Sequence, residues 1–344
     1  MRIESIGVSV PSRKVTNDDI LNWLEENSRP MSPMLVKTYQ RMVRGLLSMA
    51  GSDTRYIRNS NEKACDFILE AMRRAFAKVS IDKNDIDLLI YCGVGKGFLE
   101  PANGYFYAQK MGLACSCFDI VDACMSWIRA LEISYEFFKS GRYRHVMILN
   151  GEFNIQHGFP DNLKIHSLRQ IEYTFPTYTI GEAATATILS PSEAEWRFAY
   201  KSVPALADLC TIPLHGYDNF VEPNKRLGKN GLNNFVSFGK ELFEAARCYL
   251  VPVVKELVPD LDEPDIYFPH AASDAAYLSA SKDICLPEDK MYTKVFPQYG
   301  NIVSASIPVG MDMALQEGRL KRGQKVVLCP ASAGMVFSAV RFTY

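Results

Sequence analysis

The sequence has almost no net charge and no long apolar run. Its 344 residues include 38 lysines and arginines against 39 aspartates and glutamates, which leaves a net charge of −1. Composition therefore gives no reason to expect nucleic-acid binding. No apolar stretch approaches the ~20 residues that span a bilayer. The charged start, Met1 to Ser5, lacks the pattern of a secretory signal peptide. We expect neither nucleic acid nor a membrane as a partner.

Cysteine and histidine do not occur in patterns that bind metals or form a disulfide framework. The nine cysteines are odd in number and irregularly spaced, and the pair Cys115 and Cys117 lacks a second pair nearby. His157, His166 and His215 stand in loop-like stretches without ligand spacing. We expect reduced thiols, a cytoplasmic location, no metal and no bound cofactor.

Strands and helices alternate in two series. The content of 48% hydrophobic and 22% charged residues is that of a globular protein with a sizeable core, and the length suggests two domains or one two-lobed domain. The pattern predicts α/β architecture with two similar βαβ-rich halves, 1–192 and 193–344, divided near Pro191. Strands are expected at 3–10, 86–91, 118–121, 146–150, 198–203, 265–268, 291–295 and 325–329, and helices at 62–79, 101–111, 233–257, 272–281 and from 302.

A single cysteine stands where a buried strand turns sharply into a helix. The strand is expected at 118–121, the helix runs to about Lys139, and Cys124 lies at the turn between them. A helix N-terminus lowers the pKa of a thiol there, and its free N–H groups can stabilise an oxyanion beside the sulfur. The alternative is that Cys124 is a small buried hydrophobic residue.

Two further polar residues follow strand ends in the second half. His270 comes directly after the predicted strand 265–268, and Asn301 follows Gly300 before a helix rich in small residues. In α/β folds, residues just past strand ends line the functional crevice. Taken separately, the histidine is also explained as a structural side chain and the asparagine as a helix cap.

Between residues 29 and 60 the charge is strongly positive. This predicts a contact surface for an anion, such as a nucleotide phosphate or an acidic carrier protein, for which Arg41, Arg44 and Arg55 are the candidates. The alternative is an ordinary solvated helix face. The cations Arg29, Lys37, Arg41, Arg44, Arg55 and Arg58 stand against one acid, Asp53.

Taken together and in order, these features resemble the β-ketoacyl-acyl-carrier-protein synthase III family of the thiolase superfamily. The resemblance covers nearly the whole chain. Its motifs are Gly51-x-x-x-Arg55-Tyr56, Ile81-Asp82-x-x-Asp85-Ile86-Asp87, Asp119-x-x-x-Ala123-Cys124, Gly181-Glu182-Ala183-Ala184, His270, Gly300-Asn301-x-x-Ser304-Ala305-Ser306-Ile307-Pro308, and the ending Gly334 to Phe342.

The resemblance implies a thiolase fold in α-β-α-β-α layers, a homodimer, and a Cys-His-Asn active site between the two halves. It further implies that Cys124 accepts an acyl group from coenzyme A or acyl carrier protein. His270 and Asn301 then stabilise the enolate of a second thioester during a Claisen condensation. The second oxyanion donor is expected from the backbone of a C-terminal loop that contains Gly334.

Three positions depart from the family pattern. Ser273 replaces a usual asparagine, and Asp122 stands beside the nucleophile, where a charge opposes thiolate formation unless it is paired. Glu100, before Pro101, is similar to the glutamate of thiolases that join two acyl-coenzyme A chains head to head. There it resembles a base that acts across the dimer on the acyl α-carbon. The alternative is a solvated loop glutamate.

Three functions are compatible with these residues. The first is condensation, in which the carbanion comes either from a malonyl or β-ketoacyl thioester or from deprotonation by Glu100. The second is transfer of the acyl chain from Cys124 to an oxygen or nitrogen acceptor. The third is a non-catalytic subunit, against which the intact Cys, His and Asn argue.

Overall fold

The computed structural model describes residues 1–29, 31–153, 160–270 and 272–344. His157, set aside above, lies outside these residues. Within them, no helix combines the length and the apolar character needed to cross a membrane.

The first half is built on a five-stranded sheet. Its strand β4 is an apolar run, Leu-Leu-Ile-Tyr-Cys, as expected for a strand that is covered on both faces. Strand β4 runs parallel to β5 and β6, whereas β7 is antiparallel to β6 and to β1. The order is β1 (Arg2–Ser9), β7 (Ala183–Ser190), β6 (Val146–Glu152), β4 (Leu88–Cys92) and β5 (Ser116–Ile120).

The second half repeats this order. Strand β11 is parallel to β12, as β4 is to β6. Strand β14 is antiparallel to β12 and to β8, as β7 is to β6 and to β1. The short β13 (Ala331–Ser332) also pairs with β14. The four strands are β8 (Trp196–Ser202), β14 (Val336–Thr343), β12 (Lys325–Cys329) and β11 (Ile266–Pro269).

The strand predicted at 291–295 is wrong. Only an isolated bridge between Tyr267 and Met291 remains at the place that β5 occupies in the first half. The apolar residues that follow form α10 (Val295–Tyr299) instead. Periodicity alone cannot separate a short buried strand from a short buried helix.

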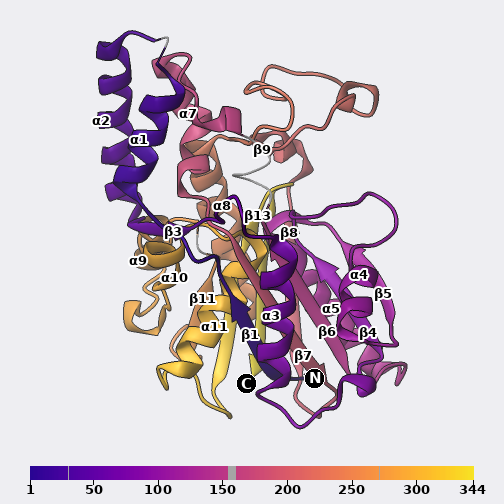
Figure 1. Cartoon of the computed structure of the whole chain (residues 1–344). Coiled ribbons are helices and arrows are strands. Elements are labelled where there is room, and N and C mark those ends of the chain that lie inside the picture. The colour runs from indigo at the N-terminus through magenta and orange to yellow at the C-terminus, as the bar shows by residue number, and fades with distance from the viewer. Residues whose placement is uncertain (30, 154–159, 271) are drawn as a thin grey trace.

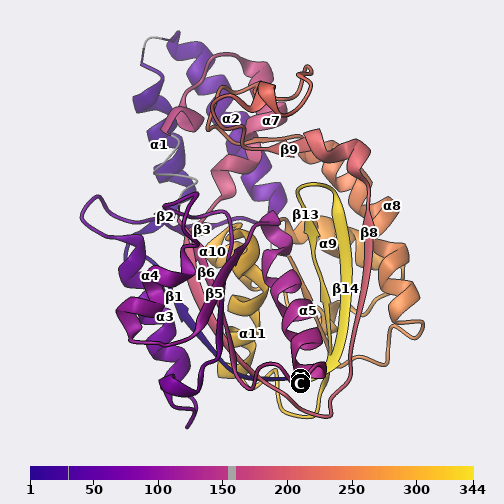
Figure 2. The ribbon, with the colours of Figure 1, turned by 90° about the vertical axis from the view of Figure 1, so that its right-hand side faces the viewer.

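Five layers result, and the predicted fold class is confirmed. Helices α5 (Ser126–Lys139) and α11 (Ser306–Gln316) lie between the two sheets, and their apolar residues share one core with strands of both sheets (Figures 1 and 2). The outer face of the first sheet packs against α3 (Ala64–Phe76) and α4 (Gly104–Met111), and that of the second against α8 (Gly239–Leu257) and α9 (Asp274–Asp283).

A helical hairpin extends from this body (Figure 1). It consists of α1 (Asn17–Asn27) and α2 (Pro33–Ala50), which pack on the short α7 (Ile171–Thr174) region through a separate apolar core. Thr16 caps α1 in a capping box with Asp19, as its sequence favours. Two small ribbons lie nearby, β2 (Lys14–Thr16) with β3 (Thr54–Tyr56) and β9 (Cys210–Thr211) with β10 (Val236–Ser237).

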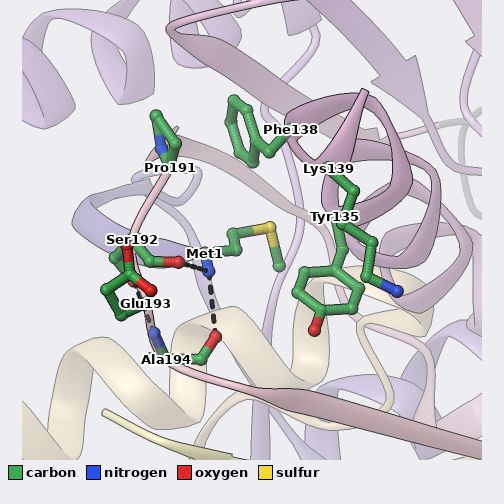
Figure 3. Close-up of a pocket in the computed structure, with 8 residues that line it drawn as sticks. All are labelled: Met1, Tyr135, Phe138, Lys139, Pro191, Ser192, Glu193 and Ala194. Atoms are coloured by element: carbon green, nitrogen blue, oxygen red, sulfur yellow. Dashed lines mark hydrogen bonds between the residues drawn. The ribbon is translucent and has the colours of Figure 1, made fainter. Parts of the chain in front are cut away.

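The chain start is anchored to the connection between the halves. The amino group of Met1 donates to the carbonyl oxygens of Ser192 and Ala194, 3.0 and 3.1 Å away, beside a small pocket that Tyr135 and Lys139 also line (Figure 3). This pocket lies at the C-terminal end of α5. It is thus about 20 Å along that helix from Cys124, so it is separate from the site described below.

Gly7 allows α3 to lie directly on β1. A Cβ atom at Gly7 would stand 2.1 Å from the carbonyl oxygen of Ala71 and 2.4 Å from the nitrogen of Ala75, both backbone atoms. Gly45, in the middle of α2, has nothing within 4 Å of the same position.

These two glycines form a matched pair for a stability test. We expect Gly7→Ala to lower the free energy of unfolding by about 3 kcal/mol, because helix and sheet must separate. Gly45→Ala should raise it by about 1 kcal/mol, since alanine is favoured over glycine in a helix. Urea unfolding of both variants measures the difference, and equal effects of the two substitutions would contradict the close packing of β1 and α3.

Candidate active site

Cys124 lies in a strained turn between β5 and α5. Ala123, directly before it, has a φ of 43°, which is unusual for a residue with a side chain. A 3-10 turn, Ala123–Met125, then leads into α5 at Ser126. The Ser126 hydroxyl accepts from the Asp122 N–H and donates to the Ala123 carbonyl, both at 2.8 Å. We call residues 122–126 the cysteine turn.

The surroundings of the sulfur are apolar and partly enclosed. Burial raises the pKa of the Cys124 thiol well above its ordinary value, and the neighbouring Cys210 and Glu152 raise it further. The backbone N–H groups of Cys124 and Ala333 act in the opposite direction. The sequence-based expectation of a lowered pKa is therefore wrong for the substrate-free site, because desolvation outweighs the donors at the turn. Cys124 nevertheless remains partly exposed.

Asn301 is fixed in a second strained turn, before α11. Its backbone N–H donates to the Thr179 carbonyl at 2.8 Å, and its side-chain Oδ1 accepts from the Val303 N–H at 2.9 Å. Val303 has a φ of 50°. Because Oδ1 is engaged, the Nδ2 group is left as a donor. We call residues 300–304 the asparagine turn.

His270 follows β11 and is buried, with 4% of its surface exposed. Burial lowers the pKa of its imidazole to about 4, so the ring is neutral at neutral pH. Within the described residues, the ring forms no hydrogen bond. Both nitrogens are therefore available to a reacting group. Ser273, at the position of the usual asparagine, caps α9 by accepting from the Ala276 N–H at 3.3 Å.

The segments that carry the three predicted residues lie at the seam between the halves. The cysteine turn packs against the 3-10 turn Val303–Ala305 that follows Asn301, and Cys124 and Val303 share one apolar cluster. On the other side, the Tyr277 phenol lies against the backbones of His270 and Ala331 and interacts electrostatically with Cys124. Tyr277 was missed because, in the sequence, it is one of several apolar residues on a helix.

Each turn is held by a segment from the opposite half. Ser332, in β13, accepts from the Met125 N–H at 3.1 Å and donates to the Asp122 carbonyl at 3.2 Å. Glu152, at the end of β6, accepts from the hydroxyl and the N–H of Ser304. Sequence analysis missed both residues. For Glu152 there was a signal, since an acid ends an otherwise uncharged buried strand.

The other predicted residues divide into three groups. The first group is the predicted phosphate contacts, of which Arg55 is wrong. The side chain is fully buried and donates to Asn17 Oδ1 at 2.9 Å and to Ser52 Oγ at 3.0 Å. Arg41 is exposed, and Arg44 is exposed and paired with Asp18 at 2.7 Å, so these two stay predictions.

The second group concerns the loops around Cys124. Gly334 is exposed and has a φ of 77°, but the backbone at the sulfur is that of the preceding residue, Ala333. The backbone at the sulfur thus belongs to the predicted loop, to Ala333 and not to Gly334, and the role of an oxyanion donor there stays a prediction. Asp122 is paired with Arg129 at 3.0 Å, which offsets the effect of its charge on the thiolate.

Glu100 forms the third group. It is exposed in the single chain, in the loop between β4 and α4 that stands out from the body of the molecule (Figures 1 and 2). Its apolar neighbours Phe98 and Leu99 are 50% and 85% exposed. The role assigned to Glu100 across a dimer stays a prediction. No group of side chains suited to a metal ion occurs among the described residues.

Comparison with solved structures identifies the fold. OleA of Xanthomonas campestris, as a Cys-to-Ser variant with bound lauric acid and lauroyl-CoA, superposes with a TM-score of 0.83 at 20% identity, covering 99% of this chain and 98% of that one. The 3-oxoacyl-[acyl-carrier-protein] synthase III of Aquifex aeolicus gives 0.79 at 21% identity, covering 100% and 99%. The chain has the thiolase fold.

Comparison of the sequence with known families and proteins identifies its relatives within this fold. Residues 259–344 match the family model described as the 3-oxoacyl-[acyl-carrier-protein] synthase III C terminal. The β-ketoacyl-[acyl-carrier-protein] synthase III of Neisseria gonorrhoeae is 25% identical over 350 residues, covering 100% of this chain and 99% of its own. That of Methylococcus capsulatus is 26% identical, covering 100% and 98%. The predicted resemblance is confirmed, and with it the enzyme class, an acyltransferase of the condensing type.

The asparagine turn allows a test that separates folding from chemistry. Asn301→Asp keeps the acceptor for the Val303 N–H and replaces the free Nδ2 donor by an anionic oxygen. We expect the thermal unfolding midpoint to stay near that of the wild type, while condensation slows by about 10²–10³-fold, as when an oxyanion donor is lost. Full activity of this variant would rule out Asn301 as a donor to the substrate.

Proposed function

We propose that the protein joins two acyl thioesters by Claisen condensation at a site formed by Cys124, His270 and Asn301. The observation that supports the proposal is that the cysteine turn packs against the turn that follows Asn301, while Tyr277 lies against the His270 backbone and interacts with Cys124. The Cys124 thiol has two backbone donors at its sulfur, the His270 imidazole is neutral, and the Asn301 carboxamide keeps its Nδ2 donor unused among the described residues.

In the first step, Cys124 takes the acyl group. Its sulfur attacks the thioester carbonyl, and the N–H groups of Cys124 and Ala333 stabilise the tetrahedral oxyanion. The thiol loses its proton to the neutral His270 imidazole, which returns it to the departing thiolate of the carrier. Because one thioester replaces another, the exchange costs little energy, and the acyl group then remains on the sulfur.

In the second step, the second thioester becomes an enolate. His270 and the Nδ2 group of Asn301 donate to its oxygen, and since both groups are neutral they stabilise the charge without protonating the carbanion carbon. The carbanion attacks the acyl carbon on Cys124. A carbon–carbon bond forms, the carbon–sulfur bond breaks, and the released Cys124 thiolate takes up the proton that the base removed from the α-carbon.

Glu100 of a second subunit is our candidate for the base that forms the enolate. Three features support this role. The loop is exposed in the single chain, its apolar residues Phe98 and Leu99 are half and largely exposed there, and β5 is at the edge of its sheet. A homodimer formed along this edge would bury the loop and place a desolvated carboxylate, whose pKa rises on burial, at the neighbouring site.

The proposed acyl donor is a coenzyme A or carrier-protein thioester. The support is the bound lauroyl-CoA named for OleA, the carrier protein in the names of the relatives, and the exposed cations Arg41 and Arg44 on the projecting α2. Either a nucleotide phosphate or an acidic protein surface would pair with such cations.

The first step can be tested without the second. We expect intact-protein mass spectrometry to show a single acyl adduct after mixing with a panel of acyl-coenzyme A thioesters, and peptide mapping to place it on Cys124. Cys210→Ser, at a neighbouring thiol, serves as the control and should retain the adduct. If neither protein gains acyl mass from any thioester in the panel, the proposal of a thioester-accepting enzyme fails.

The second step depends on the base. We expect Glu100→Gln to reduce condensation by about 10²–10⁴-fold, the range of general-base catalysis, and to leave acylation of Cys124 intact. Near-wild-type turnover on a malonyl thioester would show that loss of carbon dioxide supplies the carbanion instead. Formation of an ester or amide would show that the enzyme transfers the acyl chain to an oxygen or nitrogen acceptor and does not catalyse condensation.

Two inactive variants can test whether the base acts across a dimer. Differently tagged Cys124→Ala and Glu100→Gln chains, expressed together, would form heterodimers in which one of the two sites has both groups. We expect such heterodimers to recover about half of the wild-type activity. If they stay inactive while each variant remains folded, Glu100 does not act in the partner's site.

A further inference from the structure

Glu152 is a buried carboxyl group that the two proposed steps do not use. It ends β6 and is 3% exposed. Its Oε1 accepts from the Ser304 hydroxyl and from the Ser304 N–H at 3.3 Å, and its Oε2 accepts from the Val94 N–H at 3.0 Å. Within the described part of the chain it has no salt bridge. A carboxyl at such depth without a cationic partner is costly to bury, and groups of this kind are concentrated at functional sites.

The carboxyl fixes the orientation of Ser304. The Asn150 side-chain amide donates to the Ser304 hydroxyl at 2.7 Å, and the Thr185 hydroxyl donates to Asn150 Oδ1 at 3.0 Å. The Ser304 hydroxyl must therefore use its one proton on Glu152. This chain of bonds has a single direction, which begins at Thr185 and ends at the carboxyl.

Ser304 belongs to the turn that presents Asn301. The two residues are linked through Val303, whose N–H binds the Asn301 side chain and whose φ of 50° is strained. A turn in this conformation persists only when its surroundings hold it. Glu152 thereby stabilises the asparagine turn, as Ser332 stabilises the cysteine turn. It also binds Val94, at the start of the loop that leads to Glu100.

The same carboxyl is linked by contacts to the proposed nucleophile, because the cysteine turn packs against the 3-10 turn Val303–Ala305, whose Ser304 is bonded to Glu152. Its charge raises the pKa of Cys124, and burial raises the pKa of Glu152 itself to about 7. The other titratable groups that face it are Tyr91 and Cys92 of β4, and their pKa values are raised well above normal. Glu152 is thus the group of this set that changes charge near neutrality.

We propose that Glu152 is a positioning residue for the condensation, which holds the asparagine turn through Ser304 and places a negative charge behind the cysteine turn. Two effects follow. Loss of the Ser304 contact weakens the enolate site, and loss of the charge activates the sulfur. The first effect rests on the proposed function, whereas the second concerns only the thiol.

The pH dependence has a definite sign. Below about pH 6, Glu152 holds its proton and leaves Cys124 unaffected. As the pH rises through 7 the carboxylate forms and raises the pKa of the thiol, so the thiolate fraction increases by less than tenfold per pH unit. Removing the charge restores the full increase.

Alkylation of Cys124 by iodoacetamide measures the thiolate without any substrate. We expect Glu152→Gln to react about three- to tenfold faster than the wild type at pH 8 and at an unchanged rate at pH 6, with the site of alkylation assigned by peptide mapping. Equal rates for the two proteins from pH 6 to pH 9 would overturn the electrostatic half of the proposal.

Two further variants separate orientation from charge. Ser304→Ala keeps the charge and loses the contact, and Glu152→Asp keeps the charge but is one methylene too short for Ser304. We expect both to alkylate as slowly as the wild type at pH 9 and to lose about tenfold or more in kcat for condensation, with KM little changed, while acylation of Cys124 persists. Wild-type condensation by Ser304→Ala would overturn the positioning role, even if the Glu152 variants failed to fold.

Discussion

The site depends on two turns whose backbone is held in a strained conformation. Ala123 and Val303 have φ values of 43° and 50°, and each precedes a helix that lies between the sheets. Neither conformation is favourable for a residue with a side chain. Each turn is stabilised by a hydrogen-bonding group from the opposite half, Ser332 or Glu152. The strain at each turn can therefore persist only when both halves are folded and packed together.

The duplicated topology explains why the two turns differ in chemistry while sharing geometry. In the first half the residue after the strained position is Cys124, the proposed nucleophile, and in the second it is Ser304, whose hydroxyl is bonded to Glu152. One turn carries the sulfur that we propose to react, and the other holds the backbone next to Asn301. The two positions are equivalent in the fold, but the residues around them give Cys124 a proposed catalytic role and Ser304 a structural one.

Much of the fold could be predicted from the sequence, because strands covered on both faces are apolar runs and helices between them keep their period. The sites that depend on three-dimensional surroundings could not. Arg55 looked like a surface cation, although packing buries it. The dipole argument for Cys124 gave the wrong direction, because desolvation depends on neighbours that are distant in sequence. Cys124, His270 and Asn301 were found through the order of motifs, since no single one of them is diagnostic.

The exposed edge of strand β5 affects how the newly synthesised protein folds and assembles. It has hydrogen-bonding partners on one side only among the described residues, and exposed apolar side chains, among them Phe98 and Leu99, lie on the loop before α4. An uncovered strand edge of this kind attracts other strands indiscriminately. A freshly synthesised chain therefore carries an aggregation hazard until the edge is covered, so that the yield of native protein depends on the competition between correct assembly and precipitation.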